Sequence, residues 1–416
     1  MKALVTGGTG FLGTHLVTEL LHDDWTVRVL ARRVGRATRL PEGVEVVIGD
    51  LDDNGVLGEA ARGADVVFHL AAATSGPWEA HAATTVEGTR RMLEACHDAG
   101  VRRFILASSI VVYDKSGRVP GEVIRESSEL LEAAPAAGAY ARGKLEAERL
   151  ARQYMLGAAG GSKGNRSAAS PADAGRMEVV IVRPGLVYGP GRLAFPHLGE
   201  LFGETRVAYG SPSLLLPLVE ACSCARALVH LATSTAAGGR TYNVIDAHST
   251  TRDEYLRAIE SVTGHRPRTL YLPARPVAFA CGMLGRIGRA AGVTRMAELS
   301  QDKIRARSIE LRYDTSALQA DTSWRPLQSF EHGLARTLEL PAVGPRRSIE
   351  RVGIVGAGAM ARAHAAALRR VPGVRIVGIL DTDLAAAESL ATSAGGAPAF
   401  DDSRQFYGRA RPDLVH

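Results

Sequence analysis

The sequence is poor in cysteine. Its 416 residues include only four, Cys96, Cys222, Cys224 and Cys281, and their spacing fits neither a disulfide framework nor a zinc site. Cys222 and Cys224 could together hold a metal, but two small thiols in a buried element are the preferred interpretation. We therefore expect no metal site and a reducing, cytoplasmic location.

Aromatic residues and net charge are also scarce. Only 5% of the residues are aromatic, the formal net charge is +6, and the arginines are scattered along the chain. This composition argues against a nucleic-acid-binding surface. A small positive charge still suits ligands that carry phosphate.

Long hydrophobic runs are absent as well. The most apolar helical stretch, residues 277–287, is too short to span a membrane, is interrupted by Arg286 and is followed by Arg289. No signal peptide precedes the first predicted strand, so we expect no membrane partner. We expect the apolar stretch to line a core or a substrate pocket.

Glycine, by contrast, is abundant, and it is concentrated where the chain begins, in the stretch KALVTGGTGFLG at residues 2–13. An apolar strand at residues 3–5 leads into the glycines, and a helical pattern follows at residues 15–21. Gly7 permits a tight turn, Gly10 lets the backbone approach a pyrophosphate, and Gly13 lets helix pack on strand. The alternative is a merely structural turn. The residues predicted to bind a dinucleotide here are Gly7, Thr9, Gly10, Phe11, Leu12 and Gly13.

The end of the second predicted strand, residues 26–30, indicates which nicotinamide cofactor binds. An acidic residue at this point would bind the ribose of NAD, whereas an arginine accommodates the 2'-phosphate of NADP. Arg32 and Arg33 follow the strand, with Arg36 and Arg39 close behind and no acid among them. We therefore expect NADP, with Arg32 as its ligand. NAD, with a solvated basic loop here, is the alternative.

Further strands are predicted at residues 44–51, 66–72, 103–109 and 178–182, alternating with helical patterns. This alternation predicts an α/β fold with a doubly wound parallel sheet. His69 within one strand is expected to be a buried structural histidine. The small residues Ala71 and Ala72 at the end of that strand let the backbone approach a ligand.

A tyrosine and a lysine four residues apart, Tyr140 and Lys144, lie at the start of a predicted helix and share one of its faces. A free phenol has a pKa near 10, and a nearby ammonium lowers it toward the range of acid–base catalysis. Ser109, at a strand end, can donate a hydrogen bond to a substrate oxygen. A helix-surface pair is the alternative interpretation of the tyrosine and lysine.

Together these patterns resemble the extended short-chain dehydrogenase/reductase family, which includes NAD-dependent epimerases and dehydratases, over residues 1–340. The matching segments are Thr6-Gly7-x-x-Gly10-x-x-Gly13, Gly49-Asp50-Leu51, His69-Leu70-Ala71-Ala72, Ser108-Ser109, Val112-Tyr113, Tyr140-x-x-x-Lys144, Arg183-Pro184-Gly185-Leu186-Val187-Tyr188-Gly189-Pro190 and Ser323-Trp324-Arg325-Pro326.

The resemblance implies a Rossmann fold and a role for each site residue. Ser109 would be the oxyanion donor, Tyr140 the acid and base, and Lys144 the group that tunes the tyrosine and binds the cofactor ribose. Asp50 and Leu51 would lie at the adenine, and residues 184–187, including Pro184 and Val187, near the nicotinamide.

Three departures from the family pattern narrow the reaction. Ile110 and Val111 stand where dehydratases carry Asp-Glu, which disfavours dehydration. Leu186 replaces an asparagine that many nucleotide-sugar epimerases place at the substrate diphosphate. Thr85 replaces another asparagine, which puts a proton relay through that position in doubt.

The composition also predicts the domain organisation. A core at about residues 1–190 contains a flexible Gly/Ala/Ser-rich insertion at 157–175. A smaller, mostly helical cap over the strand ends begins at about residue 192 and includes a short strand at 242–245. Thr251 and Glu254 form a predicted capping box. Residues 341–348 form a linker.

A second glycine pattern follows the linker. A strand at 351–355 precedes Gly356-Ala-Gly358-Ala-Met-Ala361, and the strand at 375–380 ends in Asp381, an arrangement typical of NAD binding. Gly356, Gly358 and Asp381 are the predicted ligands. Residues 349–416 resemble the first part of the glucose-fructose oxidoreductase and inositol dehydrogenase (Gfo/Idh/MocA) family. We expect an incomplete unit with apolar surface exposed.

These observations predict an NADP(H)-dependent oxidoreductase acting on a small organic substrate. A nucleotide-sugar epimerase with the same three catalytic residues and a non-catalytic NAD(P)-binding regulator are the alternatives. The resembled family often pairs through a four-helix interface, which suggests a homodimer.

Overall fold

The computed structural model describes residues 1–33, 40–132, 138–156, 177–263, 267–291, 301–339, 351–369, 374–410, 412 and 414–415. The predicted insertion, the predicted linker, Arg36 and Arg39 lie outside the described residues. The chain divides into two compact units, Met1–Val343 and Gly344–His416, called unit 1 and unit 2 below.

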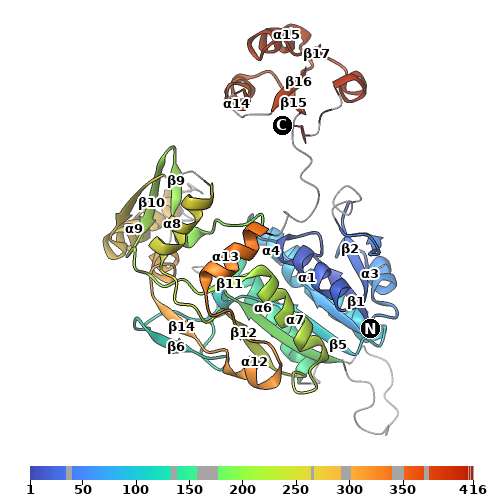
Figure 1. Ribbon diagram of the computed structural model, residues 1–416, viewed down its shortest axis with the longest axis vertical. Helices are drawn as coiled ribbons and strands as arrows, with labels where there is room; N and C mark the ends of the chain where they lie inside the picture. The colour runs from blue at the N-terminus through green and yellow to red at the C-terminus, as the bar shows by residue number, and fades with distance from the viewer. Residues whose placement is uncertain are drawn as a thin grey trace. The chain divides into compact units, whose positions relative to one another are not determined.

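Unit 1 is built around a seven-stranded sheet in which every pair of neighbouring strands is parallel (Figure 1). The strand order is β12-β7-β5-β4-β1-β2-β3, so the chain winds outward in both directions from β1. The strands are β1 (Lys2–Thr6), β2 (Thr26–Ala31), β3 (Glu45–Ile48), β4 (Val66–His69), β5 (Arg103–Ala107), β7 (Glu178–Pro184) and β12 (Thr241–Val244).

Helices cover both faces of this sheet. On one face, α1 (Phe11–His22) and α7 (Ala221–Thr233) bury Leu16, Leu20 and Leu228 against the strands. On the other, α3 (Asn54–Ala61), α5 (Gly88–Asp98) and α6 (Ala139–Met155) bury Leu57 and Leu93 in a second core. The predicted α/β class with a doubly wound parallel sheet is therefore confirmed.

The prediction for residues 242–245 is wrong in one respect. They form a strand, but β12 pairs with β7 at the edge of the main sheet and does not belong to the cap. Helices α7 and α12 (Ser316–Asp321) also pack on the main sheet, so the chain returns to the core after residue 192. The local pattern of apolar residues indicates that a segment is a strand, but it does not indicate which distant strand that segment pairs with.

The cap contains a sheet as well as helices. Strands β13 (Arg268–Leu272), β10 (Thr205–Tyr209) and β9 (Glu200–Phe202) form a three-stranded sheet. The cap was predicted to be mostly helical, but it contains both strands and helices. Helices α8 (Arg252–Thr263), α9 (Ala274–Ala291) and α11 (Gln301–Ala306) accompany it. The predicted capping box is present, because the backbone N–H of Thr251 donates to Glu254 and that of Glu254 to the Thr251 hydroxyl.

The apolar stretch within α9 is only partly buried. Ala278 is fully buried, but the Phe279 side chain is 63% exposed and that of Met283 49%. These two side chains therefore do not lie in a core, and the alternative that the stretch lines a substrate pocket stays a prediction. Among the described residues, no helix is long and apolar enough to cross a membrane.

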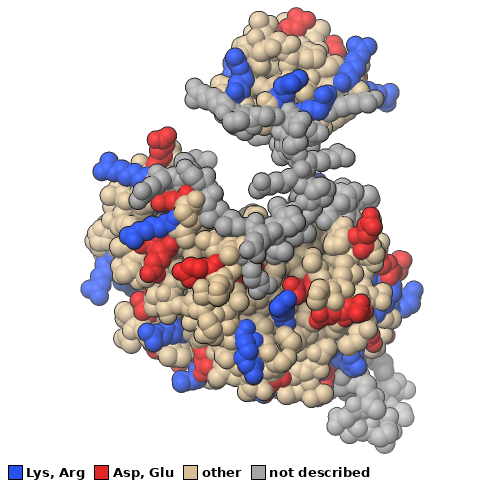
Figure 2. All heavy atoms as spheres, in the orientation of Figure 1, with Lys and Arg blue, Asp and Glu red and all other residues tan. Residues whose placement is uncertain are grey.

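Smaller elements complete unit 1. They are α4 (Trp78–His81), η1 (Ala82–Glu87), η2 (Ile110–Val112), η3 (Pro196–Leu198), α13 (Phe330–Glu339), the strand pair β6 (Glu122–Ile124) and β14 (Leu311–Tyr313), and the strand pair β8 (Leu186–Tyr188) and β11 (Leu218–Glu220). On the visible face of unit 1, acidic and basic side chains are interspersed (Figure 2).

The burial predicted for Cys222 and Cys224 is observed. Cys96, Cys222 and Cys224 are buried, and Cys281 on α9 is partly exposed. Within the described ranges, no group of three or more His, Cys, Asp or Glu side chains could hold a metal ion.

Unit 2 is a four-stranded parallel sheet in the order β17-β16-β15-β18. Its core buries Ile354, Ile379 and Leu390 between sheet and helices. Val355 and Tyr407 are about half exposed, at 48% and 54%. The elements are β15 (Arg351–Val355), α14 (Ala359–Leu368), β16 (Arg375–Leu380), α15 (Leu384–Ser393), β17 (Ala399–Phe400), α16 (Ser403–Gln405), η4 (Phe406–Ala410) and β18 (Leu414–Val415).

Candidate active site

The glycine turn between β1 and α1 leaves no room for side chains. Gly7 has a φ of +73°, and a Cβ there would lie 2.7 Å from the backbone nitrogen of Ala71. A Cβ on Gly13 would lie 2.2 Å from the carbonyl oxygen of Gly7. Strand, turn and helix are therefore in direct backbone contact, and the end of β4 lies against the turn.

The start of α1 fits the phosphates of a dinucleotide. Gly10 is the N-cap residue and no side chain caps the helix, so the N–H groups of its first turn remain available for an anion. Arg32, just after β2, is exposed and has no partner among the described residues. Thr9, Phe11 and Leu12 are partly buried in the same turn.

The other predicted cofactor ligands are distributed over four strand ends. Asp50 accepts a hydrogen bond from the backbone of Leu51, which is buried against Gly88 of α5. Ala71 and Ala72 are partly exposed beyond β4. Pro184 is buried at the end of β7, and Val187 on β8 is partly buried in the core that includes β1.

Ser109, Tyr140 and Lys144 converge at the end of β5. Tyr140 and Lys144 lie one turn apart on α6, and the side chain of Ser109 makes a polar contact with the Tyr140 phenol. The Lys144 ammonium donates to the carbonyl oxygen of Ala107, the last residue of β5, at 2.6 Å. The Ser109 hydroxyl also accepts a weak 3.3 Å hydrogen bond from the backbone of Val111.

Burial has the largest effect on the pKa values of Tyr140 and Lys144. It raises the pKa of Tyr140, while the charge of Arg192 and the contact with Ser109 act in the opposite direction. Burial also lowers the pKa of Lys144 to about 8, against the charge of Glu148. The expectation that the Lys144 ammonium lowers the pKa of Tyr140 is therefore wrong: burial raises that pKa, and the groups that oppose burial are Arg192 and Ser109.

Two neighbours of Tyr140 were not predicted from the sequence. Arg192, after the turn that follows β8, lies with its guanidinium 5.7 Å from the centre of the Phe11 ring and acts on the tyrosine through its charge. The His81 ring packs edge-on against that of Tyr140 with centres 6.2 Å apart, and its Nδ1 has no hydrogen-bond partner in the part of the chain that the structure describes. The only sequence signal for Arg192 was its position, two residues after the family-like segment that ends at Pro190.

Thr85 and His69 occupy structural positions near the site. The Thr85 hydroxyl accepts a hydrogen bond from the backbone of Ala73 at 3.0 Å, beyond the end of β4. His69 is buried, with Nδ1 bonded to Thr6 and Nε2 to Thr89. Burial, with a smaller contribution from Lys144, lowers the pKa of His69 to about 3. His69 is therefore a neutral structural histidine, as expected.

A buried ion pair holds α6 in place. Glu148, one turn after Lys144, accepts two hydrogen bonds from Arg183 of β7 at 2.9 and 2.6 Å, and both side chains are fully buried. The Arg183 guanidinium lies 4.6 Å from the centre of the Tyr113 ring. The Tyr113 hydroxyl donates to Asn243 of β12 at 2.6 Å. These contacts join helix α6 to strands β7 and β12.

The glycine turn of unit 2 shares a positive φ with the first turn but not its close backbone packing. Gly356 has a φ of +93°, and Gly358 lies at the start of α14 with open space around it. The Asp381 carboxylate, after β16, accepts hydrogen bonds from the backbone of Ala357 at 2.6 Å and of Asp383 at 3.0 Å. These bonds lower its pKa, so the ionised carboxylate lies directly beside the turn.

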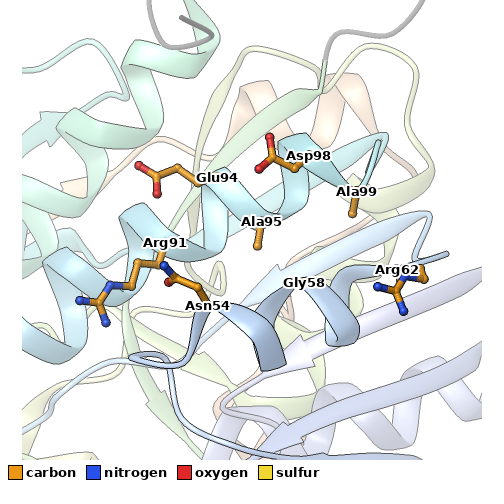
Figure 3. Close-up of a pocket in the computed structure, with 8 residues that line it drawn as sticks. All are labelled: Asn54, Gly58, Arg62, Arg91, Glu94, Ala95, Asp98 and Ala99. Carbon is orange, nitrogen blue, oxygen red and sulfur yellow. The ribbon is translucent and has the colours of Figure 1, made fainter. Parts of the chain in front are cut away.

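A separate hollow of about 340 Å³ lies between α3 and α5 (Figure 3). Polar and charged side chains, including Arg62, Arg91, Glu94 and Asp98, line it together with small residues. It contains none of the predicted site residues. Its mixed charge and its place between two helices fit a surface groove better than a catalytic pocket.

Residues 3–244 match the model of the NAD dependent epimerase/dehydratase family. The chain belongs to this family. It is accordingly an NAD(P)-dependent enzyme of the extended short-chain dehydrogenase/reductase type. Residues 350–416 match a second model, that of the oxidoreductase family with an NAD-binding Rossmann fold (GFO_IDH_MocA). Both resemblances inferred from the sequence are confirmed.

Curated relatives and solved structures agree with this assignment. The chain is 32% identical over 282 residues to ceramide reductase of Caulobacter vibrioides, covering 65% of this chain and 73% of the relative. It is 30% identical over 283 residues to 3 beta-hydroxysteroid dehydrogenase/Delta 5→4-isomerase of Mycobacterium tuberculosis, covering 64% and 70%. The solved structure of MoeE5 in complex with UDP-glucose and NAD is 25% identical, with a TM-score of 0.59, covering 82% of this chain and 98% of that one.

Proposed function

We propose that the chain is an NADP(H)-dependent oxidoreductase that transfers a hydride between nicotinamide and a carbinol or carbonyl carbon of a small organic substrate. The observation that carries this proposal is the position of Tyr140, beside Ser109 and one helical turn before Lys144. The reductase and dehydrogenase names of the two curated relatives support net redox chemistry.

Each of the three side chains has a separate task in this reaction. When bound, the nicotinamide supplies or accepts the hydride. Tyr140 gives its phenolic proton to the substrate oxygen during reduction and takes it back during oxidation. Because burial raises its pKa, the phenol is protonated and ready for the reducing direction. Ser109 donates a hydrogen bond to the same oxygen, and Lys144 binds the cofactor ribose.

NADP is the proposed cofactor because of Arg32. Its exposed guanidinium follows β2 directly, where the 2'-phosphate of NADP would lie, and no described carboxylate neutralises it. The glycine turn supplies the pyrophosphate site for either cofactor. The discrimination between NADP and NAD would therefore come from Arg32.

In unit 2, we propose that the glycine turn binds the adenosine half of NAD. The ionised Asp381 carboxylate beside Gly356 and Gly358 would accept hydrogen bonds from ribose hydroxyls. We assign no catalytic residue to this unit.

A nucleotide-sugar epimerase is the second candidate, favoured by the likeness to MoeE5, whose structure holds UDP-glucose and NAD. The same side chains would oxidise and then reduce one carbon while the cofactor is retained. A non-catalytic regulator is the third, but it has no need of Ser109, Tyr140 and Lys144.

One assay separates the three candidates. The full chain is incubated with NADPH and a panel of carbonyl compounds, and separately with UDP-glucose, while the absorbance of the reduced nicotinamide is followed. An oxidoreductase consumes NADPH in proportion to product. Sugar conversion without a net change in absorbance would identify an epimerase, and cofactor binding without turnover of either panel would identify a regulator.

A further inference from the structure

The helical segment that leads into α5 begins against the helix that carries Tyr140. Residues 78–98 form one uninterrupted helical segment, made of α4, η1 and α5, and both α4 and η1 pack on α6. The turn η1 is π-helical, a rare form that occurs frequently at functional sites. His81 is the last residue before this turn, and its ring meets the Tyr140 ring edge-on, with centres 6.2 Å apart.

Two contacts hold this segment on α6. A Cβ added at Gly143, in the interior of α6, would lie 3.4 Å from the Cβ of His81. The Arg142 guanidinium lies 3.5 Å from the centre of the ring of Trp78, the first residue of α4. Glycine inside a helix costs stability relative to alanine, and here it lets the segment rest on the helix backbone. The position of His81 beside Tyr140 is therefore fixed by packing.

Although the His81 ring is held in place, one of its nitrogens has no partner. The side chain is 2% exposed, and the enclosed Nδ1 makes no hydrogen bond with any described residue. A buried nitrogen without a partner is unfavourable, so its presence in a native protein calls for an explanation. Thr85, one turn later, differs in this respect, because its hydroxyl accepts a hydrogen bond from the backbone of Ala73.

The surroundings of His81 favour a neutral imidazole. Burial, with a smaller contribution from Lys144, lowers the pKa of His81, so near pH 7 the ring carries a single N–H. Among the described residues, the charged groups that act on the two rings are Lys144 on His81 and Arg192 on Tyr140. Glu79, the acid of α4, is exposed. A neutral ring of this kind can donate one hydrogen bond.

We propose that His81 is a positioning residue for Tyr140, and that its Nδ1–H donates a hydrogen bond to the tyrosine oxygen when that oxygen gives up its proton. The tyrosine proton goes to the substrate oxygen, and His81 keeps its own. This role rests on the proposed function, but the hydrogen bond itself can be measured without turnover.

The phenolate needs such a donor because burial favours the neutral phenol. Ser109 makes one polar contact with the Tyr140 oxygen, and His81 would supply a second donor. Catalytic hydrogen bonds are often open in the absence of substrate and tighten in the transition state. A nitrogen that has no partner beside a protonated phenol fits this behaviour.

The test measures the ionisation of Tyr140 in the full chain without a substrate. Expression with 3-fluorotyrosine lowers the pKa of every phenol, and fluorine NMR follows the ten tyrosines separately. The Tyr140 signal is the one that Tyr140→Phe removes. We expect His81→Phe, which keeps an edge-on ring without an N–H, to raise the titration midpoint of Tyr140 by at least about one pH unit, the value of a hydrogen bond to a charged group.

Three further variants separate the hydrogen bond from packing. His81→Asn places an amide N–H near the position of Nδ1 and should keep the midpoint of the wild type. His81→Leu has neither ring nor N–H and should raise the midpoint as His81→Phe does. His97→Phe is the matched control, because the exposed His97 ring on α5 meets the Tyr154 ring edge-on with centres 6.2 Å apart. It should leave the midpoint unchanged.

Turnover provides a separate measurement. With NADPH and a carbonyl substrate from the assay above, His81→Phe should lower kcat by about tenfold and leave KM nearly unchanged. An unchanged Tyr140 midpoint in His81→Phe and His81→Leu, or an equal rise in His81→Asn, would overturn the proposal. A midpoint that rises only in His81→Phe and His81→Leu, in a chain without oxidoreductase activity, would keep the hydrogen bond and refute only the proposed function.

Discussion

At the scale of single residues, the chemistry depends on one phenolic proton. Tyr140→Phe removes that proton and little else, because the ring keeps its contact with His81. We expect turnover to fall by about a hundred- to ten-thousand-fold, the usual contribution of a positioned acid or base. Cofactor affinity should be nearly unchanged. Steady-state rates and a cofactor titration on the same preparation check both, and a variant that retained most of its activity would refute the assigned mechanism.

A second residue-scale prediction concerns His69 and acid stability. Its pKa is about 3 in the folded chain and about 6.5 when unfolded, so between these values only the unfolded chain binds the proton. The free energy of unfolding should therefore fall as the pH drops below 6.5, by up to about 1.4 kcal/mol per pH unit for this group. His69→Gln should lessen the loss between pH 7 and pH 5. Denaturant unfolding followed by tryptophan fluorescence reports on unit 1, which holds Trp25, Trp78 and Trp324. An unchanged pH dependence in the variant would exclude His69 as the source.

At the scale of elements, the contact between the glycine turn and α1 admits no extra atom. Gly13→Ala places a Cβ 2.2 Å from the Gly7 carbonyl oxygen, so the backbone must shift. We expect a lower Tm and at least about tenfold weaker cofactor binding, because the helix N-terminus moves away from the phosphates. Gly58→Ala in α3 is the matched control, since nothing lies within 4 Å of its Cβ, and it should stabilise by about 0.4–1 kcal/mol. Equal behaviour of the two variants would contradict the packing argument.

Elements also show where sequence reasoning succeeded and failed. The first glycine turn and the positions of Tyr140 and Lys144 on one helix face depend on neighbours within a few residues, and the local pattern was sufficient for them. The pairing of β12 with β7 and the approach of Arg192 to Tyr140 depend on segments far apart in the chain. The roles of the site residues stay predictions.

At the scale of the whole molecule, two glycine turns with opposite charges beside them predict two cofactor preferences in one chain. Arg32→Ala should weaken NADP binding by about ten- to a hundredfold, the value of a charge-assisted bond, and leave NAD binding unchanged. Asp381→Ala should weaken only the NAD site of unit 2. Calorimetric titration of the full chain with each cofactor measures both, and each variant is the control for the other. Equal loss of NADP and NAD affinity in Arg32→Ala would remove the basis for NADP preference.

The burial of three of the four cysteines makes the molecule a selective target for thiol reagents. Cys96, Cys222 and Cys224 are enclosed, and burial raises the pKa of Cys96 and Cys224, so almost no thiolate is available at these two positions. Cys281 on α9 is partly exposed. A maleimide dye should therefore attach once to the native chain and four times after denaturation, as intact mass would show. More than one label on the native chain would contradict this burial. A single fluorophore on the cap would then report on cap movement during turnover without any engineered mutation.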